Sequence, residues 1–191
     1  TRSTIRTNPV PYYGIVGNNV GYIVISTFAI ENCSKDIKKA LIELKQQGAK
    51  SIVLDLRGNG GGLLGEAVNV VNFFVPKGKE IVVTKGKIKQ AGTTYKTMNE
   101  PVDTEIPLAV LVDGSTASAS EIVSGSLQDL DRAIVVGSRT YGKGLVQVPR
   151  ELPYNSSMKV TTAKYYIPSG RCIQAIDYSL PDRKSGSAGM P

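Results

Sequence analysis

Residues Ser51–Phe74 read S-I-V-L-D-L-R-G-N-G-G-G-L-L-G-E-A-V-N-V-V-N-F-F. The run Ser51–Leu56 is short and apolar, which is typical of a buried strand. Arg57–Gly62 supplies a glycine-rich turn. Leu63–Phe74 then places apolar side chains on one helical face, at Leu64, Ala67, Val68 and Val71. A buried strand that leads through a turn into an amphipathic helix indicates an α/β fold.

The same rhythm continues on both sides of this stretch. Before it we expect an irregular lead-in over residues 1–19, a strand over Val20–Thr27 and a helix over Ser34–Gln47. Ser34 can cap that helix and Gly48 can end it. After it we expect strands at Ile81–Thr84, Thr93–Met98, Leu108–Val112 and Ala133–Gly137, a helix at Ala119–Leu130, and a hairpin of Leu145–Val148 with Met158–Tyr166. One folded domain is expected over residues 20–177, with a frayed tail over residues 178–191.

The composition is that of a globular protein with one domain. The chain has 191 residues, of which 41% are hydrophobic, so it can bury a core without disulfides or metal. No apolar run reaches the roughly 18 residues of a membrane-spanning helix, and no signal peptide is visible. We therefore expect a processed or excised piece without an integral membrane segment. The net charge of +7 suits an anionic partner, but the lysines are dispersed, so a solvated surface is favoured over a nucleic-acid site.

The two cysteines offer little chemistry. Cys33 and Cys172 are too few for a disulfide framework, and the chain has no histidine to complete a zinc site. Both are expected to be unpaired or to form at most one optional bridge.

A serine in the stretch Asp113–Glu121, D-G-S-T-A-S-A-S-E, is the first candidate for chemistry. Ser118 follows an expected strand and precedes an expected helix, where backbone N–H groups point outward and the positive end of the helix dipole lies. The same residues satisfy S-x-x-E, so Ser118 can instead cap the helix while Glu121 completes a capping box. Spacing alone does not exclude the neighbouring serines, which are Ser115, Ser120, Ser124 and Ser126.

Because histidine is absent, a lysine is the obvious base for a serine nucleophile. Lys143 lies between two glycines in T-Y-G-K-G, 143 − 118 = 25 residues after Ser118. A lysine on a turn can equally be a solvated surface residue. A basic lysine must be neutral, and moving a lysine pKa from about 10.4 towards 7 requires about 4–5 kcal/mol from its surroundings. Leu145 and Val146 could desolvate the amine, and Gln147 could hold it without adding a negative charge.

The glycine-rich turn allows two interpretations. Gly60, Gly62 and Gly65 form G-x-G-x-x-G between a strand and a helix, as in a dinucleotide-binding turn. The acidic residue about 20 positions later, Glu80, precedes the next expected strand, whereas a ribose-binding acid should follow it. The N–H groups of the same turn can alternatively form half of an oxyanion hole.

Four blocks of sequence together resemble the C-terminal processing, or tail-specific, peptidases. The blocks are L-D-L-R-G-N-G-G-G-L, S-T-A-S-A-S-E, G-S-R-T-Y-G-K-G-L-V-Q and T-A-K-Y-Y-I-P-S-G-R-C-I-Q, and they follow the family's order and spacing between residues 12 and 174. The resemblance implies an α/β core related to the Clp-protease and crotonase group, built from repeated strand-strand-helix units. It makes residues 20–177 a peptidase catalytic domain.

The resemblance also implies roles for individual residues. Ser118 corresponds to the nucleophile of this serine-protease family and Lys143 to its base, a Ser-Lys dyad that Gln147 assists. The oxyanion hole corresponds to the backbone N–H of Ala119 and a glycine N–H of the turn, for which Gly61 and Gly62 are the candidates. The resemblance implies no cofactor and no metal.

The setting implied by the resemblance is the bacterial periplasm or cell envelope, where such a hydrolase cleaves proteins or peptides near their C-termini. The oligomeric state stays open. Family members usually carry a PDZ-type peptide-binding domain ahead of the strand at Val20–Thr27, and no part of this sequence corresponds to it. A catalytically incompetent peptide-binding fragment is therefore one alternative, and a dinucleotide-binding protein that uses Gly60–Gly65 is another.

Overall fold

The main sheet has four parallel strands and one antiparallel edge strand. The computed structural model describes residues 7–87 and 92–176. The strand order is β1-β2-β3-β6-β7, and β1 runs antiparallel to β2. The bounds are β1 Tyr12–Val16, β2 Val20–Val24, β3 Ser51–Asp55, β6 Leu108–Val112 and β7 Ile134–Gly137. Ile23, Leu54 and Val110 pair in register across three strands and are fully buried, because strand side chains alternate between the two faces.

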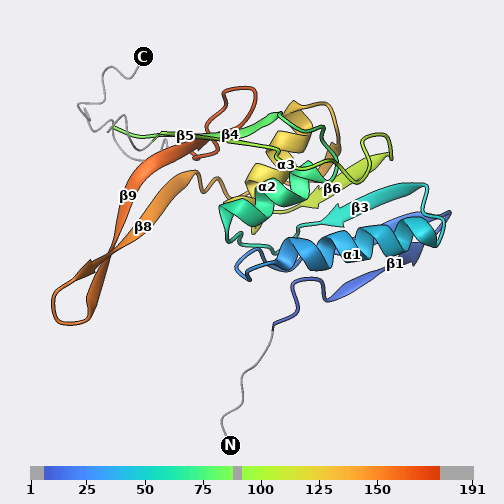
Figure 1. Cartoon of the computed structure of the whole chain (residues 1–191), viewed down its shortest axis with the longest axis horizontal. Coiled ribbons are helices and arrows are strands. Elements are labelled where there is room, and N and C mark those ends of the chain that lie inside the picture. The colour runs from blue at the N-terminus through green and yellow to red at the C-terminus, as the bar shows by residue number, and fades with distance from the viewer. Residues whose placement is uncertain (1–6, 88–91, 177–191) are drawn as a thin grey trace, which may run out of the picture.

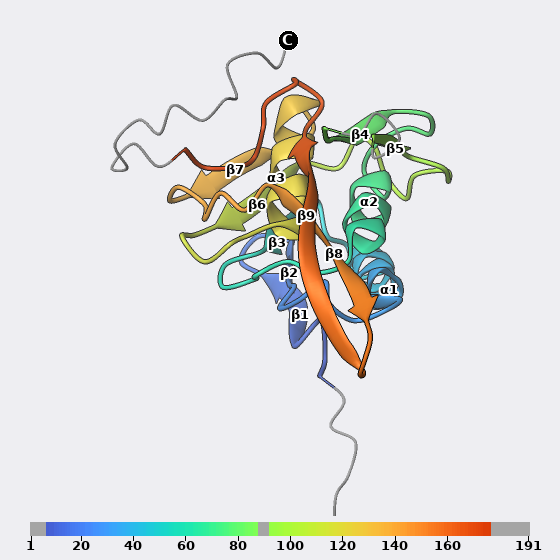
Figure 2. The ribbon, with the colours of Figure 1, turned by 90° about the vertical axis from the view of Figure 1, so that its left-hand side faces the viewer.

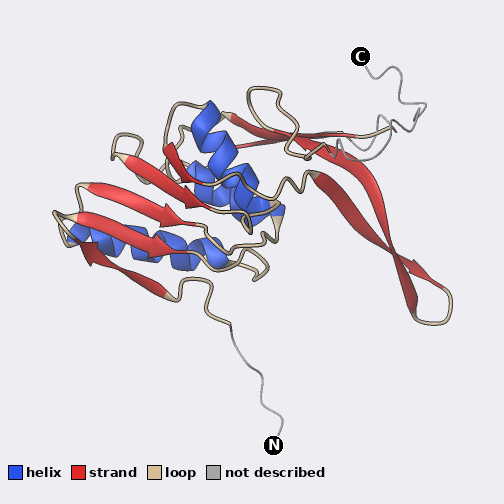
Figure 3. Cartoon of the chain, turned by 180° about the vertical axis from the view of Figure 1, so that it is seen from behind, coloured by secondary structure: helices blue, strands red, loops and turns tan. Residues whose placement is uncertain are grey.

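Three helices cover one face of this sheet, and the view from behind shows the other face (Figures 1 and 3). They are α1 Cys33–Gln46, α2 Leu64–Asn72 and α3 Ala119–Asp129. Ile37, Leu41 and Leu44 of α1 are fully buried, as expected for a helix with one apolar stripe. The core therefore lies between the helices and one face of the sheet.

A second, antiparallel sheet has the order β5-β4-β9-β8. Its strands are β4 Glu80–Lys85, β5 Thr93–Lys96, β8 Leu145–Leu152 and β9 Ser156–Tyr166. The hairpin of β8 and β9 projects from the body of the molecule as a long arm (Figures 1 and 2). Most of its side chains are exposed, so the arm contributes little to the core.

The parallel strands determine where chemistry can take place. β3, β6 and β7 all run in the same direction, so the segments that follow them leave from the same edge of the sheet. These segments are the glycine-rich turn (Leu56–Leu63), the turn that carries the candidate nucleophile (Asp113–Ser118, the nucleophile turn) and the loop that carries the candidate base (Ser138–Gly144, the base loop). The fold thus gathers at one edge three segments that are far apart in the sequence.

The expected α/β architecture is confirmed, and every expected strand and helix is present. The largest differences are that β2 ends at Val24 instead of Thr27 and that β8 continues to Leu152 instead of ending at Val148. The lead-in was wrongly expected to be irregular throughout. Tyr12–Val16 forms β1, which a turn with positive φ at Gly17 and Asn19 joins to β2. Pro9 and Pro11 precede this strand and do not interrupt it.

The two ends of α1 differ in how well the sequence predicted them. Ser34 lies inside α1, and the Glu66 carboxylate of α2 caps the helix instead by accepting the N–H groups of Asn32 at 3.1 Å and Ser34 at 2.8 Å. The end of the helix at Gly48, with φ 91°, is as expected. The tail over residues 178–191 lies outside the described residues. In the described ranges, none of the helices combines the length and apolar content needed to cross a membrane.

Candidate active site

Ser118 has the backbone geometry of a constrained residue. It joins β6 to α3 with φ 55° and ψ −116°, and no other serine of the described ranges has a positive φ. Positive φ is uncommon outside glycine and persists only where the surroundings hold it. The neighbouring Ser120, Ser124 and Ser126 are buried in α3, whereas Ser118 is half-buried. Backbone geometry and access therefore favour Ser118 among these serines.

Glu121 connects the nucleophile turn to the base loop. Its carboxylate is buried, with 5% of the residue exposed, and accepts three backbone N–H groups: Ser118 at 2.8 Å, Gly142 at 2.6 Å and Lys143 at 2.8 Å. The capping box expected from S-x-x-E is present. The capping interpretation and the nucleophile interpretation are thus compatible, because the residue that completes the cap also fixes the loop that carries Lys143.

The glycine-rich turn lies directly against Ser118. A Cβ added to Gly61, which has φ 94°, would lie 2.8 Å from both the Ser118 Cβ and the Ala119 nitrogen. The Ala117 N–H also donates to the Asn59 carbonyl at 3.0 Å. Only glycine at position 61 leaves open the space in front of the Ala119 N–H.

The two candidate glycines differ in what their N–H groups do. Gly61 donates to the Asn59 Oδ1 at 2.9 Å, so its N–H already has a partner. The N–H groups of Gly62 and Ala119 have no acceptor among the residues that the structure describes. Gly62 has φ 151°, and its Cα packs on the backbone of Phe28, where a Cβ would lie 2.1 Å from the Phe28 carbonyl carbon. Gly62 and Ala119 are thus the pair with free donors.

Asp113 fixes the glycine-rich turn from the nucleophile side. Its carboxylate accepts the Gly58 N–H at 3.1 Å, the Ser115 N–H at 2.9 Å and the Thr116 N–H at 3.0 Å. These hydrogen bonds, that from Gly58 foremost, hold the pKa of Asp113 below its usual value. The Thr116 hydroxyl donates to the Leu56 carbonyl at 2.8 Å and ties the same two turns together.

A second carboxylate supports the start of the glycine-rich turn. Arg57 Nε donates to Asp55 Oδ1 at 3.0 Å, its terminal nitrogen donates to Oδ2 at 2.7 Å, and the Tyr22 hydroxyl donates to the same carboxylate. Burial alone would raise the pKa of Asp55, but the hydrogen bonds from Arg57 and Tyr22 outweigh it and hold that pKa below its ordinary value.

Lys143 and Gln147 have exposed side chains. No hydrogen bond joins Lys143 to Ser118 or to Gln147 within residues 7–87 and 92–176. Leu145 and Val146 are half-buried, but they do not bury the lysine, so the desolvation expected from them is absent here. The fold brings the backbone of the base loop to the nucleophile turn through Glu121, and the Ser118 and Lys143 side chains are not bonded to each other.

The base loop is also held from its other side. Gln174 Oε1 accepts the Gly144 N–H at 3.0 Å, and the Ala175 N–H donates to the Gly142 carbonyl at 2.9 Å. Sequence reasoning did not single out Gln174, Asn59 or Asp113 as functional. Each lies inside or beside a quoted block, and an Asx residue in a tight turn is the signal that could have identified the last two.

The described residues hold no cluster suited to a metal, and both cysteines are free. Burial, followed by the nearby Glu66 carboxylate, raises the pKa of Cys33 to about 12. A dinucleotide interpretation of Gly60–Gly65 fits poorly. The N–H groups of Gly58, Gly61 and Leu63 are already bonded to protein acceptors, and the Asp113 carboxylate lies beside the turn.

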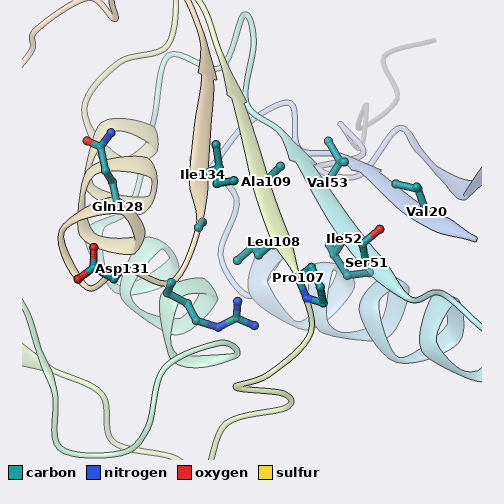
Figure 4. A pocket seen from close by; sticks show the side chains of 12 residues that line it. Val20, Ser51, Ile52, Val53, Pro107, Leu108, Ala109, Gln128, Asp131 and Ile134 are labelled. Carbon is teal, nitrogen blue, oxygen red and sulfur yellow. The ribbon is translucent and has the colours of Figure 1, made fainter.

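An open groove of about 650 Å³ lies at the opposite ends of the strands (Figure 4). Its lining includes the first residues of β3, β6 and β7, which are Ser51, Leu108 and Ile134. The segments with candidate chemistry follow the other ends of these strands. The groove is therefore separate from the candidate site.

Comparison with known proteins identifies the family of the chain. The model of peptidase family S41 matches residues 19–184. The chain is 42% identical over 198 residues to a carboxyl-terminal-processing protease of Picosynechococcus sp., covering 100% of this chain and 46% of that protein. It is 35% identical over 194 residues to the chloroplastic C-terminal processing peptidase of Tetradesmus obliquus, covering 95% of this chain and 41% of that protein.

The solved structure of a photosystem II D1 C-terminal processing protease superposes with a TM-score of 0.78 at 34% identity, covering 91% of this chain and 47% of that one. The chain thus spans less than half the length of these relatives. The family match covers most of the chain and includes the three segments gathered at one edge of the sheet. The chain belongs to peptidase family S41, a family of serine-type peptidases.

Proposed function

We propose that this chain is the catalytic core of a serine endopeptidase that cleaves proteins near their C-termini. Ser118 is the nucleophile, Lys143 the base, and Gln147 the residue that holds the lysine amine. The observation that carries the proposal is the Glu121 carboxylate, which holds the backbone of Ser118 and Lys143 through separate N–H groups. A helix cap alone does not require bonds to a loop that follows another strand.

The reaction follows from these positions. Neutral Lys143 takes the proton from the Ser118 hydroxyl as its oxygen attacks the carbonyl carbon of the scissile bond. The negative charge that develops on the carbonyl oxygen is stabilised by the N–H groups of Ala119 and Gly62, which have no acceptor among the described residues. Gly61 contributes by lacking a side chain, because a Cβ there would fill the same space. Lys143 then protonates the leaving amine, and water hydrolyses the acyl-enzyme.

The Lys143 side chain must move for this chemistry to occur. In the structure it is exposed and unpaired with Ser118, so the reactive arrangement requires the amine to turn towards the hydroxyl. Removal of water around the lysine by a bound polypeptide would favour its neutral form. The proposed substrates are therefore proteins or peptides, and the proposed setting is extracytoplasmic.

A serine-directed fluorophosphonate tests the assignment. We expect one adduct on Ser118, located by peptide mass spectrometry, and no adduct with Ser118→Ala. Ser120→Ala is the matched control and should label normally, because Ser120 is buried in α3. Labelling that persists in a folded Ser118→Ala variant would disprove the choice of nucleophile.

The exposed Lys143 also supports a second candidate, a fragment that binds peptides without cleaving them. The same experiment separates the two. A folded wild-type chain that binds peptide but neither labels nor cleaves would favour the binding fragment.

A further inference from the structure

The arm that follows the base loop has one unpaired edge. In the sheet order β5-β4-β9-β8, strand β8 pairs with β9 on one side and with no described strand on the other. Its first residue, Leu145, comes two residues after Lys143. The arm projects away from the helices, so this edge begins beside the base loop and leads away from it (Figure 1). An edge strand presents N–H and C=O groups that another extended chain can pair with.

The register shows which backbone groups face outward. The Tyr165 N–H donates to the Gly144 carbonyl at 2.8 Å, so this carbonyl faces β9. Residues of an antiparallel strand alternate between the two sides, which turns the N–H and C=O of Leu145 to the free edge. Val146 pairs with Ala163 and Gln147 with Thr161 across a register shift, and the alternation along β8 places Gln147 outward again.

Pro149 ends the usable part of this edge. It is the next outward residue by the same alternation, opposite Lys159, and proline has no N–H to donate. Exposed Arg150 and Glu151 follow it. Proline and charged side chains are the usual means of protecting an edge strand from pairing. The edge is therefore protected along the arm and left open over Leu145–Gln147, next to Lys143.

We propose that an extended segment of a polypeptide substrate adds to β8 as a further strand over Leu145–Gln147. The N–H and C=O groups of Leu145 and Gln147 would bond alternate residues of that segment and carry it past Lys143. The identity of the ligand as a substrate rests on the proposed function. The pairing would also replace water beside the lysine with peptide.

Binding of a backbone-modified peptide tests the pairing without requiring cleavage. The probe is a fluorescent peptide of Ala, Val and Ser, methylated at one backbone nitrogen at a time, and its Kd is measured with Ser118→Ala. Because only every second residue faces β8, methylation should weaken binding by about ten-fold at alternate positions and little between them. Binding that is insensitive to methylation, or equally sensitive at every position, would overturn the proposal.

A substitution on the protein gives an independent measurement. Pro149→Thr restores an outward N–H, so a peptide long enough to reach it should bind about two- to ten-fold more tightly, whereas a peptide that stops at Gln147 should not change. Pro153→Thr is the matched control, because Pro153 lies in the hairpin loop beyond β8. Equal effects of the two substitutions would contradict pairing along β8.

The outcomes separate this inference from the proposed function. If the wild-type chain cleaves the parent peptide but methylation gives no alternating pattern, the proposed peptidase function stands and the β8 subsite is refuted. If the Kd alternates with methylation position but the wild-type chain shows neither cleavage nor Ser118 labelling, the β8 subsite stands and the proposed peptidase function is refuted. Absence of any peptide binding removes the subsite, whatever the labelling shows.

Discussion

The nucleophile side and the base side of the candidate site are built differently. The half-buried Asp113 carboxylate and the Thr116 hydroxyl fix the nucleophile and glycine-rich turns to each other, and the buried Glu121 carboxylate accepts the Ser118 N–H. The backbone around Ser118 is therefore fixed by hydrogen bonds within the fold. The base loop joins this network only through its backbone: Glu121 accepts its N–H groups, and the Tyr141 N–H donates to the Thr116 carbonyl at 3.0 Å. The Lys143 and Gln147 side chains are exposed. The fold therefore fixes the backbone around Ser118, whereas in the proposed mechanism the Lys143 side chain is engaged only when a polypeptide binds.

This difference has a physical reason. A carboxylate that accepts several backbone N–H groups makes strong, charge-assisted hydrogen bonds, and these tolerate burial. An ammonium group is strongly hydrated, and burying it without a partner is costly. An exposed lysine thus avoids the cost of burying its charge in the free protein, and in the proposed mechanism a bound peptide removes water from around it.

The largest effect should come from the base side, without a change in stability. Lys143→Ala removes proton transfer, so we expect kcat for peptide hydrolysis to fall by at least about 10³-fold. The thermal unfolding midpoint should stay within the range of ordinary surface substitutions, because the side chain is exposed. Lys143→Met is the control for side-chain length. Rapid cleavage by either variant would contradict the role of Lys143.

The glycine-rich turn should show the opposite coupling of rate and stability. In Gly61→Ala the added methyl group meets Ser118 and Ala119 in a conformation with positive φ. We expect kcat/KM to fall by about 10²–10³-fold and the free energy of unfolding by about 1–3 kcal/mol. Gly65→Ala is the control, since nothing lies within 4 Å of its added methyl group. Equal behaviour of the two variants would show that close approach at Gly61 is unimportant.

Glu121→Gln tests the link between the two sides. The amide keeps the size of the carboxylate but offers one acceptor oxygen where three N–H groups converge. We expect a loss of about 1–3 kcal/mol in the free energy of unfolding, together with slower cleavage. Ser124→Ala, also buried in α3, should change neither strongly. A Glu121→Gln variant with wild-type stability and cleavage rate would show that the Glu121 carboxylate does not couple the nucleophile turn to the base loop.

Much of this comparison could be anticipated from the sequence, and part of it could not. Alternation and the helical stripe located the strands and helices, because both depend on neighbouring residues. The Ser118 and Lys143 positions came from the ordered blocks. The exposure of Lys143 and the Asn59 bond to Gly61 depend on how distant or turning segments pack, which periodicity does not record. The strand β1 was not predicted because the prolines Pro9 and Pro11 indicated an irregular segment, and the turn signal at Gly17 and Asn19 was given less weight.

The smallest effect on activity should come from an ion pair outside both sides. Asp103 accepts a hydrogen bond from Lys45. Burial alone would raise the pKa of Asp103, but the bonds from Lys45 and nearby N–H groups lower it from 3.8 to about 2. A depressed folded pKa stabilises the protein above pH 4, and this stability is lost as the pH falls through 2.

Asp103→Asn should therefore lower the free energy of unfolding at pH 7 by about 2 kcal/mol and flatten its decline between pH 4 and 2. Urea unfolding over this pH range measures the effect. Ser118 labelling should be unchanged at neutral pH. If the free energy of unfolding of the variant declined between pH 4 and 2 as steeply as that of the wild type, the Lys45–Asp103 pair would not be the cause of this decline.

The bond between Ala117 and Asn59, and those from Glu121 to the base loop, join segments that are distant in the sequence. None of these segments can reach its position until the strand before it has paired, so the nucleophile environment forms only as the long-range topology is completed. Helices can form earlier from local contacts alone. A partly folded chain therefore contains Ser118 without the groups that surround it in the native state. We expect fluorophosphonate labelling of Ser118 to appear only when folding is complete.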